Sequence, residues 1–270
     1  MTAVISVDTT TSGIPFIAGP AWPGVRSLVT TRRGGTSTGV YASLNLGDHV
    51  GDDAETVHAN RVLLSSCLPG GPLWLQQVHG VDVVDADSRD RSVLEVPCGD
   101  AAVTRQPGQV LAIMTADCLP VVIAAEDASV LAVAHAGWRG LAAGVLEQTV
   151  ARMQVDAGVA LRAWIGPAIG PRAFEVGDEV RAAFVADDAR AQDAFVLLGD
   201  GGRAAATDPA RRKWLADLPA LAARRLQRSG VETVQQSGLC TVEHPELFFS
   251  YRRDGQTGRF ATLAWIEPRG

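Results

Sequence analysis

Residues 101–153 read AAVTRQPGQVLAIMTADCLPVVIAAEDASVLAVAHAGWRGLAAGVLEQTVARM, and this stretch decides the fold. The runs VLAIMTA, VVIAA and VLAVAH are short, apolar and bounded by turn residues, which predicts three buried strands. AGWRG then opens a segment with helical spacing, LAAGVLEQTVARM. We therefore expect Cys118 and His135 at the ends of buried strands, where side chains often point into a shared cleft.

Outside this stretch the pattern changes between helix and strand without a regular rhythm. The acidic start and apolar spacing of 52–67 predict a helix that ends at the breaker 69–71. The alternating stretch 73–87 predicts a strand interrupted just after His79, and 209–229 predicts a long amphipathic helix. The C-terminal residues 231–266 return to β-type residues, with a DGQTG turn between two strand-like runs. This irregular order favours an α+β fold with mixed sheets over a doubly wound parallel fold.

Composition bounds the classes of protein that the 270 residues can form. With 47% hydrophobic and 20% charged residues, and no visible repeat or low-complexity linker, the chain is expected to be one globular domain over 1–270. The net charge of -6 argues against binding nucleic acid through bulk electrostatics. No apolar run reaches a membrane-spanning length and no signal peptide is visible, so we expect a cytoplasmic protein without membrane contact. The four scattered cysteines are expected to be thiols rather than disulfides.

Two of the five histidines and one cysteine form the strongest candidate for chemistry. His79, Cys118 and His135 each have small neighbours, in VHG, ADCLP and AHAGWRG. A thiolate with two imidazoles suits zinc, and three protein ligands leave a fourth position for water or substrate. Their spacing matches no short zinc motif, so a buried thiol with two hydrogen-bonded histidines stays an alternative. In another, Cys118 is the nucleophile of a Cys-His hydrolase, and Asp117 or another carboxylate orients the base.

Three further residues are weaker candidates for substrate contacts. Arg139 lies near the start of the predicted helix, where it could hold an anion such as phosphate. Asn45 and Arg61 could donate hydrogen bonds to a planar substrate rich in nitrogen and oxygen. A turn asparagine and surface arginines are the ordinary structural alternatives. The Gly-rich pieces RRGG and GPAIGP match neither of the phosphate-binding patterns of ATP and NAD sites.

Taken together, the motifs identify a family resemblance. LWLQQVHGVDVV, GDAAVT, TADCLPVVIA, VAHAGWRG, WIGPAIGP with FEVG, and FFSYRRDGQTGRFA resemble the YfiH family, also called the laccase-domain or multicopper polyphenol oxidase-like family. Its members include proteins named purine nucleoside phosphorylase and peptidoglycan editing factor. The resemblance runs from about residue 30 to the C-terminus. It implies a layered α/β sandwich with mixed sheets flanked by helices, and a zinc site on His79, Cys118 and His135.

The resemblance also implies an activity. Purine nucleosides (adenosine, inosine, guanosine and methylthioadenosine) would react with phosphate to give the free base and ribose 1-phosphate, and adenosine would also be deaminated. Arg139 or Arg61 could then hold the phosphate, and Asn45 could contact the base. The family name also leaves open an editing hydrolase acting on peptidoglycan precursors. A third hypothesis is a metal-binding or partner-binding protein without enzymatic activity, but a closed structural site normally has four protein ligands and the sequence offers no convincing fourth. A multicopper centre needs about four coppers and several His-x-His pairs, and the sequence contains no such pair. Copper could nevertheless replace zinc in the same three ligands, and the protein would then oxidise phenols.

Overall fold

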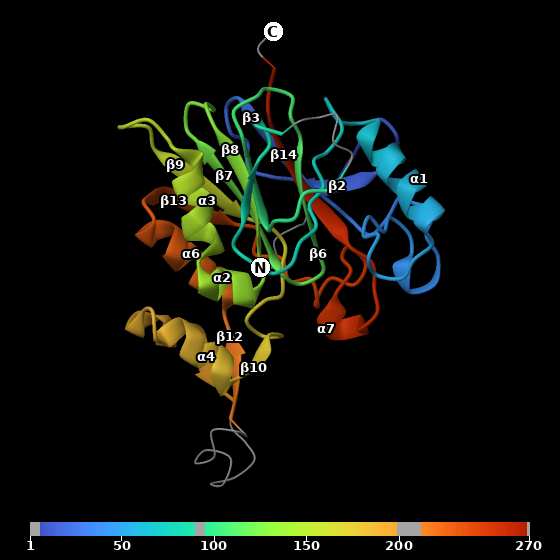
Figure 1. Ribbon diagram of the computed structural model, residues 1–270. Helices are drawn as coiled ribbons and strands as arrows, with labels where there is room; N and C mark the ends of the chain where they lie inside the picture. Colours follow the sequence, from blue (N-terminus) through green and yellow to red (C-terminus); the bar gives the residue numbers. More distant parts are fainter. Residues whose placement is uncertain (1–5, 90–94, 199–211, 269–270) are drawn as a thin grey trace.

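The computed structural model describes residues 6–89, 95–198 and 212–268, which form three β-sheets and the helices that cover them (Figure 1). The five-stranded sheet has the order β1 (Asp8–Thr9), β2 (Pro15–Ala18), β3 (Val25–Thr30), β14 (Phe260–Ile266), β6 (Leu111–Thr115). The six-stranded sheet has the order β13 (Val231–Gln236), β9 (Leu161–Ile165), β7 (Leu119–Ala125), β8 (Leu131–Ala136), β5 (Ala101–Thr104), β4 (Val83–Asp85). The three-stranded sheet has the order β10 (Glu175–Gly177), β12 (Lys213–Ala216), β11 (Phe195–Leu197).

The helices lie mainly outside the two large sheets. They are α1 (Ala54–Ser65), α2 (Trp138–Ala143), α3 (Val145–Met153), α4 (Asp178–Val185), α6 (Leu218–Arg228) and α7 (Tyr251–Asp254), with 3₁₀ turns η1 (Gly39–Tyr41) and η2 (Ala189–Ala194). Strand β13 pairs with β9 and β4 with β5 in parallel, whereas the other ladders of this sheet are antiparallel. The expected α+β class with mixed sheets is confirmed.

Alternation along the central strands explains the layers. In β7, Val121 and Ile123 pack toward the helices, whereas Val122 packs toward the five-stranded sheet. Successive side chains of a strand point to opposite faces, so a strand that is apolar on both faces must be covered on both. The two large sheets therefore enclose one core between them. A second core lies under the helices, and α1 covers the outer face of the five-stranded sheet through Leu64.

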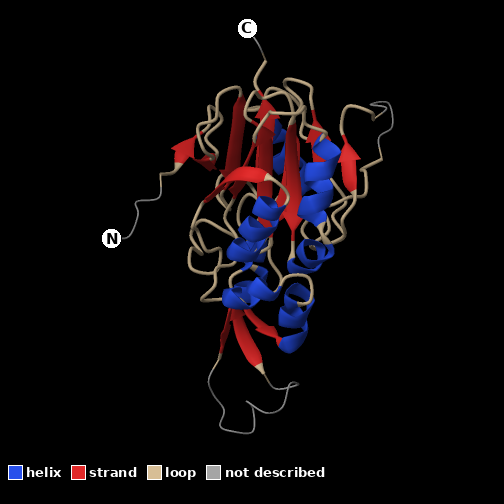
Figure 2. Ribbon diagram, turned by 90° about the vertical axis from the view of Figure 1, so that its left-hand side faces the viewer, coloured by secondary structure: helices blue, strands red, loops and turns tan. Residues whose placement is uncertain are grey.

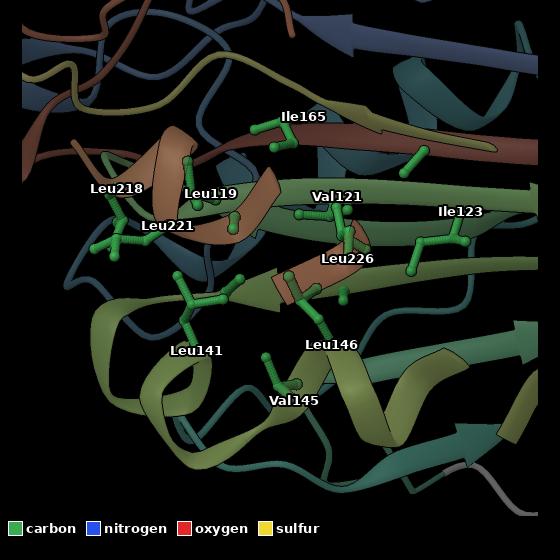
Figure 3. Packing of buried hydrophobic residues seen from close by; sticks show 14 of the residues in the cluster. Leu119, Val121, Ile123, Leu141, Val145, Leu146, Ile165, Leu218, Leu221 and Leu226 are labelled. Atoms are coloured by element: carbon green, nitrogen blue, oxygen red, sulfur yellow. The ribbon is translucent and has the colours of Figure 1, made fainter. Parts of the chain in front are cut away.

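Helices α2, α3 and α6 cover the outer face of the six-stranded sheet, and the small three-stranded sheet lies at one end of the molecule (Figure 2). Figure 3 shows the leucines and valines of these helices gathered over β7: Leu141, Val145, Leu146, Leu218, Leu221 and Leu226. The helix expected after residue 140 is two helices, because Gly144 adopts the left-handed conformation (φ +100°) between α2 and α3. None of the described helices is long and apolar enough to cross a membrane.

Two element predictions were wrong in extent. The long helix expected over 209–229 is strand β12 followed by α6, and residues 209–211 lie outside the described residues. The helix begins only at Leu218 because the Asp217 side chain accepts the Ala220 amide N–H and Pro219 occupies the first turn. The strand expected over 73–87 is regular only in β4, since the amides of 78–80 donate to a side chain rather than to a neighbouring strand.

The strand-like run before the DGQTG turn also differs from expectation. Tyr251–Asp254 forms the short helix α7. Ser250 caps it by accepting the Arg253 amide N–H, and the carboxylate of Asp117 accepts the Arg252 amide N–H. These two side-chain acceptors take up amides that a strand would have paired with a neighbouring strand.

Candidate metal site

Two of the predicted ligands come from adjacent strands of the six-stranded sheet. Cys118 directly precedes β7 and His135 lies near the end of β8. These strands are antiparallel, with Pro120 opposite His135, so the start of one meets the end of the other. By strand alternation both side chains lie on the face that carries Val122 and Val133, which pack in the core between the two large sheets. The site is therefore at one end of that inter-sheet space.

The third ligand is brought in by a loop that a buried carboxylate holds. Asp100, which is fully buried, accepts the amide N–H groups of Val78, His79 and Gly80 at 3.2, 2.9 and 2.6 Å. His79 has a positive φ of 60°, a backbone conformation that such anchoring stabilises. The sequence prediction of a strand irregularity at His79 is thus confirmed, and its cause is Asp100.

Asp100 also fixes the ring of His135. The Nδ1–H of His135 donates to the Asp100 carboxylate at 2.8 Å, which leaves Nε2 as the ring atom available to a ligand. Burial on its own would raise the pKa of Asp100, but the hydrogen bonds from His135 and Gly80 outweigh it and lower that pKa below its ordinary value. The carboxylate that orients a histidine is therefore Asp100 rather than Asp117. Sequence reasoning missed this role, although an acid directly before a buried strand is a signal.

Two glycines make room for the three ligands to meet. A Cβ atom at Gly137 would lie 2.8 Å from Cδ2 of His79 and 3.0 Å from Sγ of Cys118. A Cβ at Gly140 would lie 2.7 Å from the carbonyl oxygen of Gly80. Both contacts are closer than packed carbon atoms allow, so the AGWRG segment requires glycine at these positions.

The ligand atoms fit a tetrahedral metal ion. One ligand atom from each of His79, Cys118 and His135 lies within 4.8 Å of the others, and Sγ of Cys118 is 3.8 Å from Nε2 of His79. Zinc bonds of about 2.3 Å to sulfur and about 2.0 Å to nitrogen, at a tetrahedral angle, place such atoms about 3.5 Å apart. The imidazole rings meet edge to face, with centroids 4.7 Å apart. The described part of the chain offers no other such group.

The charges of this group also suit a cation. Burial would raise the pKa of the Cys118 thiol, but His135 and His79 facing it lower that pKa to about 6. Burial would lower the pKa of His135, but the Cys118 thiolate and the Asp100 carboxylate raise it to about 9. A metal ion needs a thiolate and a neutral imidazole, so it would bind by taking the place of a proton held within this group.

The three candidate ligands line a cavity of about 380 Å³, a volume in the range of small-molecule sites. Its walls come from both large sheets and from the segment around α7. The lining residues are His49, Gln77, His79, Met114, Thr115, Ala116, Asp117, Cys118, His135, Ile169, Phe174, Tyr251, Arg252 and Arg259.

The predicted substrate contacts lie elsewhere. Asn45 is fully buried; its side-chain oxygen accepts the amides of Gly47 and Arg259, and its nitrogen donates to Asp52. Arg61 donates to the Leu46 carbonyl and pairs with Asp48 at 3.2 Å. Neither residue is among those that line the cavity.

Arg139 is also outside the cavity lining, and its guanidinium lies over the Trp138 ring at 4.5 Å. Substrate contacts of Asn45, Arg61 and Arg139 stay predictions. The arginines that do line the cavity are Arg252 and Arg259, which sequence reasoning did not single out. Both lie in the quoted motif FFSYRRDGQTGRFA, which is the signal that could have found them.

Cys240 and His244 do not join the site. Sγ of buried Cys240 accepts the amide N–H of Gly170, and His244 faces Glu246 at 3.3 Å.

The carboxylate of Asp117 accepts hydrogen bonds from the Thr241 hydroxyl and the Arg252 amide. Asp117 therefore ties the segment around α7 to the turn that carries Cys118.

Comparisons with known proteins agree with this architecture. A family described as multi-copper polyphenol oxidoreductase laccase matches residues 26–267. The chain is 49% identical over 251 residues to the purine nucleoside phosphorylase PA4543 of Pseudomonas aeruginosa, covering 92% of this chain and 97% of that protein. It is 47% identical over 252 residues, with the same coverage, to the purine nucleoside phosphorylase YfiH of Escherichia coli.

Solved structures show the same fold. The Neisseria meningitidis protein NMB0706 superposes with a TM-score of 0.83 at 44% identity, covering 94% of this chain and 99% of that one. A hypothetical YfiH protein from Bacillus licheniformis gives a TM-score of 0.83 at 27% identity, covering 97% and 99%. The resemblance found in the sequence motifs is thereby confirmed. The chain belongs to the multi-copper polyphenol oxidoreductase laccase family, among its YfiH-like members.

Proposed function

We propose that the protein is a zinc-dependent purine nucleoside phosphorylase that acts on adenosine, inosine, guanosine and methylthioadenosine. The observation that carries the proposal is the group of His79, Cys118 and His135 in the wall of a cavity large enough for a nucleoside. Relatives that are 47–49% identical over nearly their whole length carry the name purine nucleoside phosphorylase. A cytosolic location, predicted from the sequence, would agree with such substrates.

In phosphorolysis an oxygen of phosphate forms a bond to the anomeric carbon of the ribose while the glycosidic bond breaks. The electron pair of that bond goes to the departing purine, which takes up a proton. The products are the free base and ribose 1-phosphate. The reaction therefore requires an oriented anion and stabilisation of the negative charge that develops on the base.

Residues of this chain would supply these requirements from different walls of the cavity. His79, Cys118 and His135 would hold zinc, which when bound supplies Lewis-acid stabilisation of negative charge. Asp100 would keep the two histidines in place. Phe174, Ile169 and Met114 would exclude water beside the planar base.

Adenosine deamination is proposed as a second reaction of the same site. It replaces the 6-amino group with oxygen from water and releases ammonia, and it needs no phosphate. The two reactions are therefore separable by leaving phosphate out. Formation of inosine from adenosine without phosphate would support it, whereas unchanged adenosine would exclude it.

The test is base release by protein loaded with one equivalent of zinc. We expect adenosine and inosine to yield adenine and hypoxanthine with matching ribose 1-phosphate, only when phosphate is present. Cys118→Ala should lose both bound zinc and activity, while Cys98→Ala, which removes an exposed thiol outside the cavity, should keep both. The proposal fails if zinc-loaded wild-type protein releases no base, and the ligand assignment fails if Cys118→Ala keeps full zinc occupancy.

One observation favours a second candidate, a Cys-His hydrolase acting on peptidoglycan precursors. The Cys118 thiol has a pKa lowered to about 6 and faces His79, as a cysteine nucleophile would. Hydrolysis of a UDP-linked muropeptide by metal-free protein, with covalent labelling of Cys118, would support this reading. Copper in the same ligands is a further possibility, which phenol oxidation by copper-loaded protein would test.

A further inference from the structure

Two arginines line the cavity together with the candidate metal ligands, and one of them, Arg259, is arranged to bind an anion. Arg259 precedes strand β14, so it reaches the cavity from the five-stranded sheet, whereas Cys118 and His135 come from the six-stranded sheet. Its side chain is half-buried. The two walls therefore face the same space from different sheets.

Both the backbone and the aliphatic part of the Arg259 side chain are held in place. Its amide N–H donates to the side chain of Asn45 at 2.8 Å, and its carbonyl accepts the amide of Leu46 at 3.0 Å. Gly47 lies against the stem, because a Cβ atom there would be 2.7 Å from Cγ of Arg259. The buried loop around Asn45 therefore fixes the position of Arg259.

The guanidinium is held by one of its nitrogens only. Nη1 of Arg259 donates to the carbonyls of Thr257 and Gly258, both at 3.0 Å. Nε and Nη2 have no hydrogen-bond acceptor among the described residues, and no described carboxylate pairs with this arginine. Nε and Nη2 form the edge of a guanidinium that binds carboxylate or phosphate through two parallel hydrogen bonds.

The guanidinium of Arg259 keeps its positive charge in the cavity. Burial lowers the pKa of Arg259, while the negative charges of Cys118 and Asp117 act in the opposite direction. A guanidinium stays charged at neutral pH even so. The carboxylate of Asp117 accepts hydrogen bonds from the Thr241 hydroxyl and the Arg252 amide, and it acts on Arg259 only through its charge, without a hydrogen bond to it.

A second arginine, Arg252, lines the same cavity. Nη1 of Arg252 donates to the carbonyls of Ala173 and Glu175, and its guanidinium lies over the Phe174 ring. Arg252 is exposed, so it adds positive charge at the rim rather than a fixed donor pair. The more buried Arg259 is the better anchor.

We infer that Arg259 binds the phosphate co-substrate through its free Nε and Nη2 edge. The inference rests on the proposed phosphorolysis for the identity of the anion. It assigns phosphate to an arginine different from Arg139 and Arg61, whose guanidinium groups are engaged with Trp138 and Asp48 outside the cavity lining.

The experiment measures binding of inorganic phosphate without nucleoside, by titration calorimetry and ³¹P NMR, to zinc-loaded and metal-free protein. We expect Arg259→Gln to weaken phosphate binding about 10- to 100-fold, the loss of charge-assisted hydrogen bonds. Arg259→Lys, which keeps the charge and most of the stem, should show a smaller loss. Arg32→Gln is the matched control, because Arg32 is also half-buried and donates to backbone carbonyls, but lies outside the cavity lining.

Steady-state kinetics add a second measurement. If phosphorolysis is found, Arg259→Lys should raise the KM for phosphate about threefold while the KM for inosine changes little. Circular dichroism and zinc content of each variant report on folding separately. If Arg259→Gln does not fold, Arg259→Lys carries the test.

The outcomes separate the two proposals. Phosphate binding that depends on Arg259 but without base release supports the anion site and overturns the phosphorylase. Base release with unchanged phosphate affinity in both Arg259 variants supports the phosphorylase and overturns the anion site. Weaker phosphate binding in Arg139→Gln, with unchanged binding in the Arg259 variants, would also overturn the anion site at Arg259.

Discussion

The two walls of the cavity are built on different physical principles. The ligand wall of His79, Cys118 and His135 is packed around the buried Asp100, and behind it there is no room for a Cβ atom at Gly137 or Gly140. The arginine wall is held through backbone carbonyls and leaves two donors of Arg259 unused. A metal ion requires ligands already in position, whereas an exchanging anion requires a donor that is fixed but unsatisfied. Changes to the first wall should therefore have larger effects than changes to the second.

The largest effect is expected from Gly137→Ala. The added Cβ would displace both His79 and Cys118, so we expect zinc affinity to fall about 100-fold or more. Competition with a zinc-binding dye measures this. Gly71→Ala is the control, because a Cβ there meets no atom within 4 Å. Equal zinc affinity in the two variants would show that the ligand wall can relax, and the contrast between the walls would be lost.

Asp100→Asn is expected to have the next largest effect. The amide keeps one acceptor but turns an NH₂ group toward donors, so zinc affinity should fall about 10- to 100-fold. The unsatisfied buried groups should also lower the free energy of unfolding by about 1–3 kcal/mol. Urea denaturation and zinc titration measure the two quantities. Asp53→Asn, at the cap of α1, is the control, because asparagine caps helices as well as aspartate. A loss no larger than in that control would refute the role of Asp100.

The pH dependence of the Cys118 thiol tests the charge of the ligand wall. Its pKa of about 6 lies below the ordinary value of 9.0, so the reactive thiolate persists as pH falls and is lost only below about 6. Alkylation of Cys118 in metal-free protein should therefore be nearly constant from pH 8 to 7, and fall about tenfold per unit well below pH 6. Mass spectrometry of the Cys118 peptide measures the rate, and exposed Cys98 serves as the internal control. A steady decline of the Cys118 alkylation rate from pH 9 downward would contradict the lowered pKa. Added zinc should slow the alkylation of Cys118 and leave that of Cys98 unchanged.

The smallest effect is expected from Gly47→Ala, the counterpart of Gly137→Ala in the arginine wall. The added Cβ would press on Cγ of Arg259, which a flexible side chain partly absorbs. We expect phosphate to bind about fivefold more weakly, which corresponds to roughly 1 kcal/mol, with zinc affinity unchanged. Calorimetry with each ligand measures the two affinities. A loss of zinc as large as in Gly137→Ala would mean that the walls are not independent.

Most of the central fold was predictable from residues 101–153, because each apolar run in this stretch fits a buried strand and no other element. Runs such as VVIAA and VLAVAH are too short for buried helices and have no polar face, so they form central strands. Helical spacing was misleading at 209–229, because Trp214 and Leu215 fit a strand as well as a helix and Asp217 with Pro219 decides where the helix begins. The 73–87 strand was overestimated because Asp100, distant in sequence, takes its amides.

The sequence by itself determined the candidate ligands. A thiol and two imidazoles among small residues made His79, Cys118 and His135 candidates, and the family motifs that carry them selected this set. Only the tertiary structure decided what surrounds them. Whether a carboxylate such as Asp100 orients a histidine, or an arginine such as Arg259 has donors left unused, depends on which groups the fold places within hydrogen-bond reach of its side chain. Residue identity does not specify those partners, because the folding of two sheets against each other brings them together.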